Sequence, residues 1–145
     1  MAKVLVVASR RFNGHEFWTA LGVIRERGHE VVIVSTYPVI SDEETGERFR
    51  TGKVLEDVPN LKGYDGLLVI SGNPEDTEHY WKDSTVQTYV EEARDRSLAI
   101  GAICMAVPTI RNAAKGKRVS FFPLVRSAEL LERAGAILQK VSLSV

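Results

Sequence analysis

Short apolar runs alternate along the chain with segments whose apolar residues recur at every third or fourth position. The apolar runs are rich in Val, Ile and Leu, which is typical of strands buried on both faces of a parallel sheet; they cover residues 3–8, 30–35, 66–70 and 98–105. The helical spacing predicts helices over residues 15–27 and 84–96. This alternation predicts an α/β fold, a doubly wound three-layer sandwich around a mostly parallel sheet.

The remaining segments carry more turn residues. Residues 36–62 are charged and punctuated by Pro and Gly, so we expect a partly extended excursion with a hairpin near Thr45-Gly46. Residues 76–82 are polar and aromatic, and no regular element is assigned to them. The pattern beyond the last buried run predicts a short helix to about residue 114, strands over 117–122 and 136–145, and a helix over 127–134.

Two of the predicted strands end in residues capable of chemistry. One leads into the turn 71–74 (SGNP), and the other ends on Cys104, the only cysteine of the chain. Ligands of open α/β sheets bind at the carboxyl ends of strands, so we expect these two ends to face each other across a crevice. A nucleophile in a sharp turn from strand to helix forms a nucleophile elbow. On the residues alone, the alternative is a cysteine that packs as a small hydrophobe.

Composition narrows the class of protein. With 145 residues, 44% of them hydrophobic, the chain is expected to form one domain over residues 1–145. Nineteen basic residues balance nineteen acidic ones without a long block of one sign, so we expect no nucleic-acid partner and no membrane partner. A single cysteine and three scattered histidines give no zinc-site spacing, so we expect no metal, no cofactor and a reducing, cytoplasmic location.

Three stretches resemble the ThiJ/PfpI superfamily, which includes deglycases and intracellular proteases. They are residues 102–104 (AIC) at the elbow, residues 64–72 (YDGLLVISG), and residues 116–119 (GKRV) with Pro123 beyond them. The resemblance runs along nearly the whole chain. It implies a flavodoxin-like, class I glutamine amidotransferase-like fold and a stress-related protein with a reactive cysteine.

In that family, a glutamate at the start of the first helix reaches the elbow cysteine. Glu16 resembles it, because eleven residues separate Glu16 from the segment 28–31 (GHEV). The resemblance implies that Cys104 and Glu16 are the catalytic pair, whereas on the residues alone Glu16 is also an acidic residue favoured in a first helical turn. A protonated carboxyl beside a thiolate favours the anion, so we expect a partly ionised, peroxide-sensitive thiol. By the same analogy, the backbone amides of Asn73 and Met105 are expected to bind an oxyanion.

The chain departs from the family at both of its histidine positions. Met105 follows the cysteine where peptidase-like members have a histidine, and Phe122 stands where glyoxalase-like and deglycase-like members have theirs. His15, which adjoins Glu16, and His79, which follows the turn at residues 71–74, are the candidate replacement bases. Each is otherwise expected to be a solvated surface residue.

Three functions stay open at this point, beside the alternative of a scaffold that has lost its activity and serves only as a binding partner. The first is a glyoxalase-like or deglycase-like addition of Cys104 to a small electrophilic carbonyl. The second is an intracellular cysteine peptidase or amidase acting on a peptide, which needs the base that the missing histidines supply in relatives. The third is a non-enzymatic redox-sensing or chaperone-like protein. We also expect a homodimer or higher homo-oligomer, in which a partner subunit covers an open sheet edge.

Overall fold

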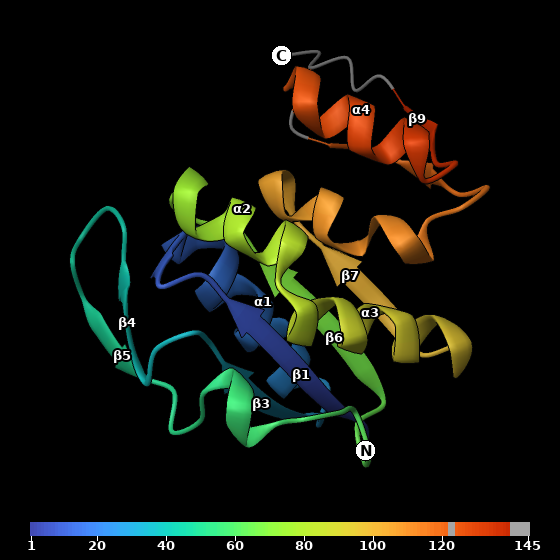
Figure 1. The fold of residues 1–145 in the computed structure, drawn as a ribbon. Coiled ribbons are helices and arrows are strands. Elements are labelled where there is room, and N and C mark those ends of the chain that lie inside the picture. Colours follow the sequence, from blue (N-terminus) through green and yellow to red (C-terminus); the bar gives the residue numbers. More distant parts are fainter. Residues whose placement is uncertain (122–123, 140–145) are drawn as a thin grey trace.

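The computed structural model describes residues 1–121 and 124–139. Its centre is a four-stranded sheet in which every pairing is parallel, with the strand order β3-β1-β6-β7 (Figure 1). The strands are β1 (Lys3–Ala8), β3 (Glu30–Val34), β6 (Gly66–Ile70) and β7 (Ala99–Ala102). All four lie within the predicted apolar runs, because branched aliphatic side chains pack well on a pleated, buried surface.

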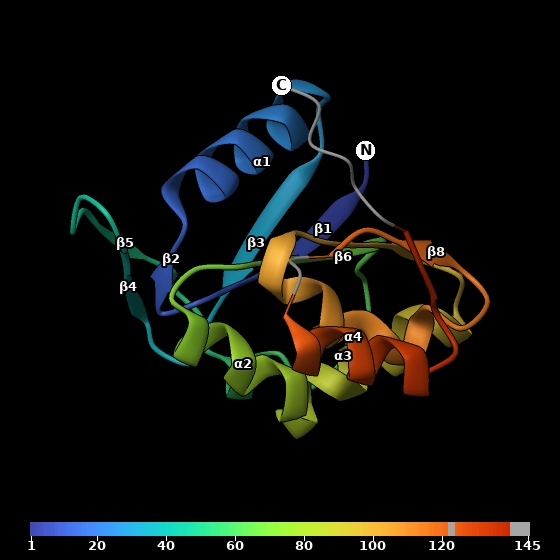
Figure 2. The same cartoon turned by 90° about the horizontal axis from the view of Figure 1, so that it is seen from above.

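Helices cover both faces of this sheet (Figure 2). One face carries α1 (Gly14–Glu26), and the other carries α2 (Pro74–Lys82) and α3 (Ser84–Asp95). Successive residues of a strand point to opposite faces, so each strand contributes side chains to two hydrophobic cores, one on each face of the sheet. Val6 packs with Phe17 of α1, whereas Leu5 packs with Tyr89 of α3. The predicted three-layer α/β sandwich is confirmed.

Strand β7 differs from the prediction for residues 98–105. It is shorter, and within the described residues it pairs with β6 alone, so it forms an edge of the sheet. Ala99 is exposed and the other three residues are half-buried, so the prediction of a strand buried on both faces is wrong. A Cβ at Gly101 would lie 3.0 Å from the end of the Leu68 side chain, so a larger residue there would have to displace that side chain slightly.

The segment after β7 begins with a 3₁₀ helix and continues into a small βαβ unit. Its elements are η2 (Cys104–Ala113), β8 (Arg118–Val119), α4 (Val125–Arg133) and β9 (Ile137–Leu138). β8 and β9 pair in parallel in a separate two-stranded sheet, and α4 contacts η2. The predicted helix over residues 127–134 is confirmed. The predicted strands over 117–122 and 136–145 are two residues long where the structure describes them, and residues 122–123 and 140–145 lie outside the described residues.

Residues 36–62 contain the predicted hairpin and one short 3₁₀ turn. Its elements are β4 (Val39–Asp42), β5 (Arg48–Arg50) and η1 (Leu55–Asp57). β4 and β5 pair antiparallel around a turn in which Gly46 has a left-handed φ of +75°. Three elements were not predicted: η1, α2 and β2 (Arg11–Phe12), which pairs with β4. In the described part of the chain, no helix is long and apolar enough to cross a bilayer.

Candidate active site

Cys104 occupies the nucleophile-elbow position, at the turn between β7 and η2. Its φ is +56°, in the left-handed region that residues other than glycine seldom adopt, while Ile103 before it is extended. A backbone strained in this way persists only where the surrounding structure enforces it, and such residues concentrate at functional sites. The predicted elbow is therefore present, with the thiol half-buried.

The helix that follows the elbow is held by Trp81 of α2 and by its own Arg111. Pro108 lies inside η2 and has no N–H, so the Met105 carbonyl lacks the i→i+3 partner that a 3₁₀ helix would provide. The indole of Trp81 in α2 donates to this carbonyl instead, at 2.9 Å in a buried position. Arg111 donates to the carbonyls of Pro108 and Trp81, at 3.0 and 2.7 Å. These bonds fix the start of η2, and with it the elbow.

The ends of β6 and β7 bring Ser71 next to Cys104. Val69 is the register partner of Ala102, and the N–H of Ile103 continues the ladder by donating to the Val69 carbonyl at 3.3 Å. Ser71 and Cys104 each stand two residues beyond this partnered pair, so they lie opposite one another where the strands end. Ser71 is buried, with 3% of its surface exposed.

Glu16 reaches the same point from the first turn of α1. The Ser71 hydroxyl lies 2.8 Å from Oε1 and 2.7 Å from Oε2 of Glu16, and the Ser71 N–H donates to Oε1 at 3.2 Å. Asn13 caps this helix by accepting from the Glu16 N–H at 3.0 Å, and its own N–H donates to the Ser71 carbonyl, also at 3.0 Å. The capping residue therefore ties the start of α1 to the end of β6.

Burial dominates the acid–base properties of both groups. Burial raises the pKa of Glu16, against hydrogen bonds from Ser71 that lower it. Burial also raises the pKa of Cys104; the Met105 N–H and the Ser71 hydroxyl lower it, whereas the charges of Glu16 and Glu43 raise it further. The net shift of the Cys104 pKa is upward, which is opposite to the partly ionised thiol expected from the sequence, because desolvation outweighs the hydrogen bonds.

The expected oxyanion role of Asn73 stays a prediction, and in this structure its backbone N–H has another partner. The Asn73 N–H donates to the Arg11 carbonyl at 2.8 Å and is occupied, and its side chain caps α2 by accepting from the Glu75 N–H. Its φ of −51° also shows that this position does not need the left-handed conformation that glycine adopts readily. The Met105 N–H acts on the thiol itself, and its use as an oxyanion donor stays a prediction.

The histidines lie apart from this group of residues. His15 is exposed on α1, and His79 is half-exposed with its Nε2 3.4 Å from Asp83. No hydrogen bond or ion pair recorded for the described residues joins His15 or His79 to Cys104, and their use as a base stays a prediction. Phe122, the second departure from the family, lies outside the described residues. Residues 1–121 and 124–139 also hold no group of His, Cys, Asp and Glu that could bind a metal ion.

A cavity of about 250 Å³ lies elsewhere on the molecule. Its lining includes His79 but not Cys104, and consists of Arg10, Thr36, Tyr37, Glu75, Asp76, His79 and Tyr80. The guanidinium of Arg10 stacks on the Tyr37 ring at its mouth, 4.4 Å from the ring centre. The cavity is therefore separate from the thiol.

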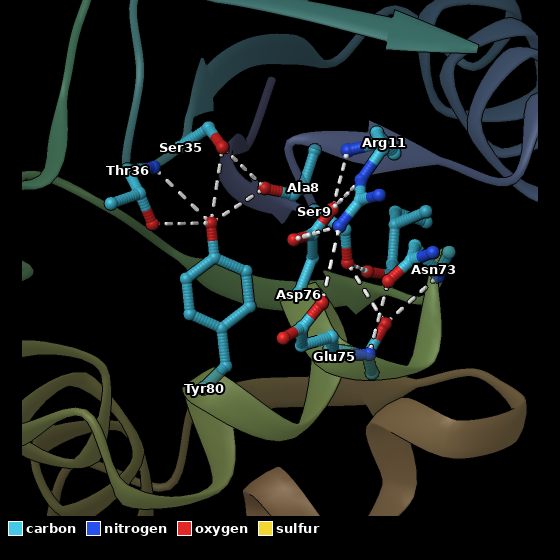
Figure 3. A network of polar contacts seen from close by, with 12 residues as sticks. Ala8, Ser9, Arg11, Ser35, Thr36, Asn73, Glu75, Asp76 and Tyr80 are labelled. Carbon is cyan, nitrogen blue, oxygen red and sulfur yellow. Dashed lines mark hydrogen bonds and ion pairs between the residues drawn. The ribbon is translucent and has the colours of Figure 1, made fainter. Parts of the chain in front are cut away.

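A polar network fastens α2 to the strand ends near this cavity (Figure 3). The Tyr80 hydroxyl donates to the Ala8 carbonyl at 2.7 Å, and Arg11 forms a two-pronged pair with Asp76 at 2.8 and 3.0 Å. Gly72 passes so close to β2 that a Cβ would lie 2.0 Å from the Arg11 carbonyl oxygen. Sequence reasoning missed this network and Ser71; the strand register was the one signal that could have placed Ser71 beside the cysteine.

Comparison with known proteins gives a consistent assignment. The model of the DJ-1/PfpI family matches residues 2–141. The protein MJ0967 of Methanocaldococcus jannaschii is 28% identical over 139 residues, which cover 94% of this chain and 67% of that protein. A ThiJ/PfpI domain protein from Brachyspira murdochii has a TM-score of 0.81 at 16% identity, over 99% of this chain and 82% of its own. DJ-1 of Schizosaccharomyces pombe has a TM-score of 0.79 at 18% identity, over 99% of this chain and 78% of its own.

The solved structures are too distant in sequence to establish more than the shared fold. The family model carries the assignment, because it spans nearly the whole chain, including the elbow and the first helix. The predicted resemblance is confirmed: the chain belongs to the DJ-1/PfpI family.

Proposed function

We propose that the protein is a stress-related enzyme in which Cys104 adds to the carbonyl carbon of small reactive carbonyl compounds, as in glyoxalase or deglycase chemistry. The supporting observation is that the buried carboxyl of Glu16 accepts hydrogen bonds from Ser71, the serine that lies opposite the elbow thiol. A nucleophile near an acid–base group of perturbed pKa is typical of sites for covalent catalysis.

The first step needs only one proton to be moved. The Cys104 sulfur bonds to the carbonyl carbon, the C=O electron pair becomes an alkoxide, and the proton lost by the thiol ends on that oxygen. Glu16 takes the proton from the thiol and returns it to the alkoxide, which yields a neutral hemithioacetal. The Met105 N–H, which acts on the thiol, is the backbone donor that we assign to the developing negative charge.

Carbonyl addition suits this site better than peptide hydrolysis. A cysteine peptidase must also protonate a leaving amine and activate a water molecule, and a histidine usually does both. Met105 follows Cys104 directly, and His79 is engaged by Asp83. The carboxyl of Glu16 is sufficient for an addition, because the addition has no leaving group.

Methylglyoxal consumption tests this proposal. We expect the wild-type protein to consume methylglyoxal, Cys104→Ser to lose the activity, and Glu16→Gln to lose about 100-fold because an acid–base group of this kind contributes that much or more. Glu26→Gln, at the exposed far end of the same helix, is the matched control and should retain the wild-type rate.

Other outcomes would replace the proposal. Equal consumption by the wild type and Cys104→Ser would contradict carbonyl addition. Casein cleavage that depends on Cys104 would support a peptidase. Oxidation of Cys104 by peroxide, without turnover of any carbonyl, would support a redox-responsive protein.

A further inference from the structure

Ser71 stands between the two reacting groups of the site. Its hydroxyl contacts both carboxyl oxygens of Glu16, at 2.8 and 2.7 Å, and the strand register sets it opposite Cys104. Its backbone is fixed as well, because its N–H donates to Glu16 and its carbonyl accepts from Asn13. A buried hydroxyl held in this way has few alternative orientations.

A serine hydroxyl carries one proton and two acceptor sites. It can therefore accept a hydrogen bond from one neighbour while it donates to another. With Glu16 ionised, the Ser71 hydroxyl donates to the carboxylate and can accept from the thiol. With Cys104 ionised, the same hydroxyl can donate to the thiolate and accept from the protonated carboxyl. In both protonation states, Ser71 can thus form a hydrogen bond with Glu16 and another with Cys104.

We propose that Ser71 is the proton bridge between Cys104 and Glu16, and that this bridge takes the place of the histidine base. The S–H bond of Cys104 breaks and its proton passes to Ser71 Oγ, while the Ser71 proton passes to a carboxyl oxygen of Glu16. The products are a thiolate, an intact serine and a protonated carboxyl, and the reverse transfer restores the starting state. No oxidant or co-reactant is consumed.

The groups around the bridge act on both of its ends. Burial raises the pKa of Glu16 and of Cys104, and the Ser71 hydroxyl lowers both. Glu43 faces both groups and raises the pKa of each, and the Met105 N–H favours the thiolate. Glu43 shifts the two pKa values in the same direction, so it changes where the groups titrate rather than which of them holds the proton. The proposal rests on the proposed function in assigning a nucleophilic role to Cys104.

The pH dependence of Cys104 alkylation by iodoacetamide tests the bridge. For the wild type we expect two steps: a rise to a plateau as the Glu16–Ser71–Cys104 group loses its first proton, and a second rise when the thiol itself ionises. The plateau reports the state in which Glu16 holds the thiol proton. Glu16→Gln should lose the plateau and keep the upper rise, because a glutamine side chain does not accept the proton.

Ser71→Ala should lower the plateau about tenfold, the typical effect of removing one hydrogen bond to a charged group. Ser35→Ala is the matched control, since Ser35 is also a buried serine at a strand end but bonds Ala8 and Tyr80 instead. It should retain both steps. Ser71→Thr keeps the hydroxyl and should retain the plateau. If Ser71→Ala does not fold, Ser71→Gly removes the hydroxyl without adding a side chain.

Two results would overturn the bridge. One is a single-step profile in the wild type, and the other is a plateau in Ser71→Ala or Ser71→Gly within about twofold of the wild type. Combining Ser71→Ala with Glu16→Gln should change nothing beyond Glu16→Gln alone, because coupled residues are not additive. Iodoacetamide has no aldehyde, so failure to consume methylglyoxal would leave the bridge standing, and loss of the bridge would leave carbonyl addition standing.

Discussion

The thiol of Cys104 is half-buried, and this burial governs its acidity. The elbow conformation points to a reactive residue, while desolvation and the nearby carboxylates hold the thiol in its protonated form. A thiol of this kind reacts by transferring its proton to a neighbouring group, because it is not already ionised before the reaction. The distinction matters because only the thiolate is a strong nucleophile.

We predict that the thiol of Cys104 titrates above the ordinary value of about 8.5. Glu16 is ionised at that pH, and its charge raises the pKa of Cys104, so Glu16→Gln should lower the midpoint. Thiolate absorbance near 240 nm, roughly where thiolates absorb, measures it, with Cys104→Ser as the blank. A wild-type midpoint below neutral pH, or a midpoint that rises in Glu16→Gln, would contradict this assignment.

The end of an apolar run pointed to Cys104, and the resemblance to the family's glutamate at the start of the first helix pointed to Glu16; the catalytic role of both stays a prediction. Ser71 could not be predicted, since serine is common in turns and only the pairing of β6 with β7 places it opposite the thiol. The partner of the Asn73 N–H could not be predicted either, because the Arg11 carbonyl that accepts from it belongs to the unpredicted strand β2.

The element that carries the nucleophile depends on a neighbouring helix for its hydrogen bonds. η2 contains a proline, and α2 supplies the indole that satisfies the carbonyl left without a helical partner. The position of η2 therefore depends on α2. A substitution in α2 should alter the elbow at Cys104 through its effect on η2.

We predict that Trp81→Phe lowers the free energy of unfolding by about 1–3 kcal/mol, because it leaves the buried Met105 carbonyl unsatisfied. Trp18→Phe is the matched control: Trp18 is 39% exposed on α1, and its effect should stay within about 0.5 kcal/mol. Urea unfolding of both variants provides the measurement. Equal effects of the two substitutions would show that the indole hydrogen bond does not hold η2.

Strands β1, β3 and β6 could be predicted closely because their apolar residues are continuous. Helix α2 was missed because its first turn is polar and its aromatic residues do not form a long helical stripe. The local signal was an N-cap pattern, with Asn73 followed by Pro74 and two acidic residues. The edge position of β7 could not be read from its sequence, because composition does not reveal how many neighbours a strand has.

Elements on both faces of the sheet contribute residues to the site. Glu16 comes from α1 on one face, and η2, which begins at Cys104, packs against α2 and α3 on the other. Ser71 lies where the two layers meet at the end of β6. Bringing a carboxylate to this buried point opposes folding, because burial disfavours its charged form.

We predict that Glu16→Gln raises the free energy of unfolding at pH 7. The pKa of Glu16 is raised by folding, so its carboxylate destabilises the native state above that pKa. Below the unfolded value of about 4.3, both states hold the proton and the charge-dependent destabilisation disappears. Urea unfolding at pH 4 and pH 7 measures this, with Glu26→Gln as control. A difference between wild type and Glu16→Gln that is equal at both pH values would contradict the assignment.

¹³C NMR of labelled methylglyoxal mixed with the protein detects a bond between Cys104 and the carbonyl carbon. We predict a hemithioacetal carbon resonance with the wild-type protein that is absent with Cys104→Ser and weakened with Glu16→Gln. Absence of that resonance from the wild type, or the same resonance with Cys104→Ser, would contradict this prediction.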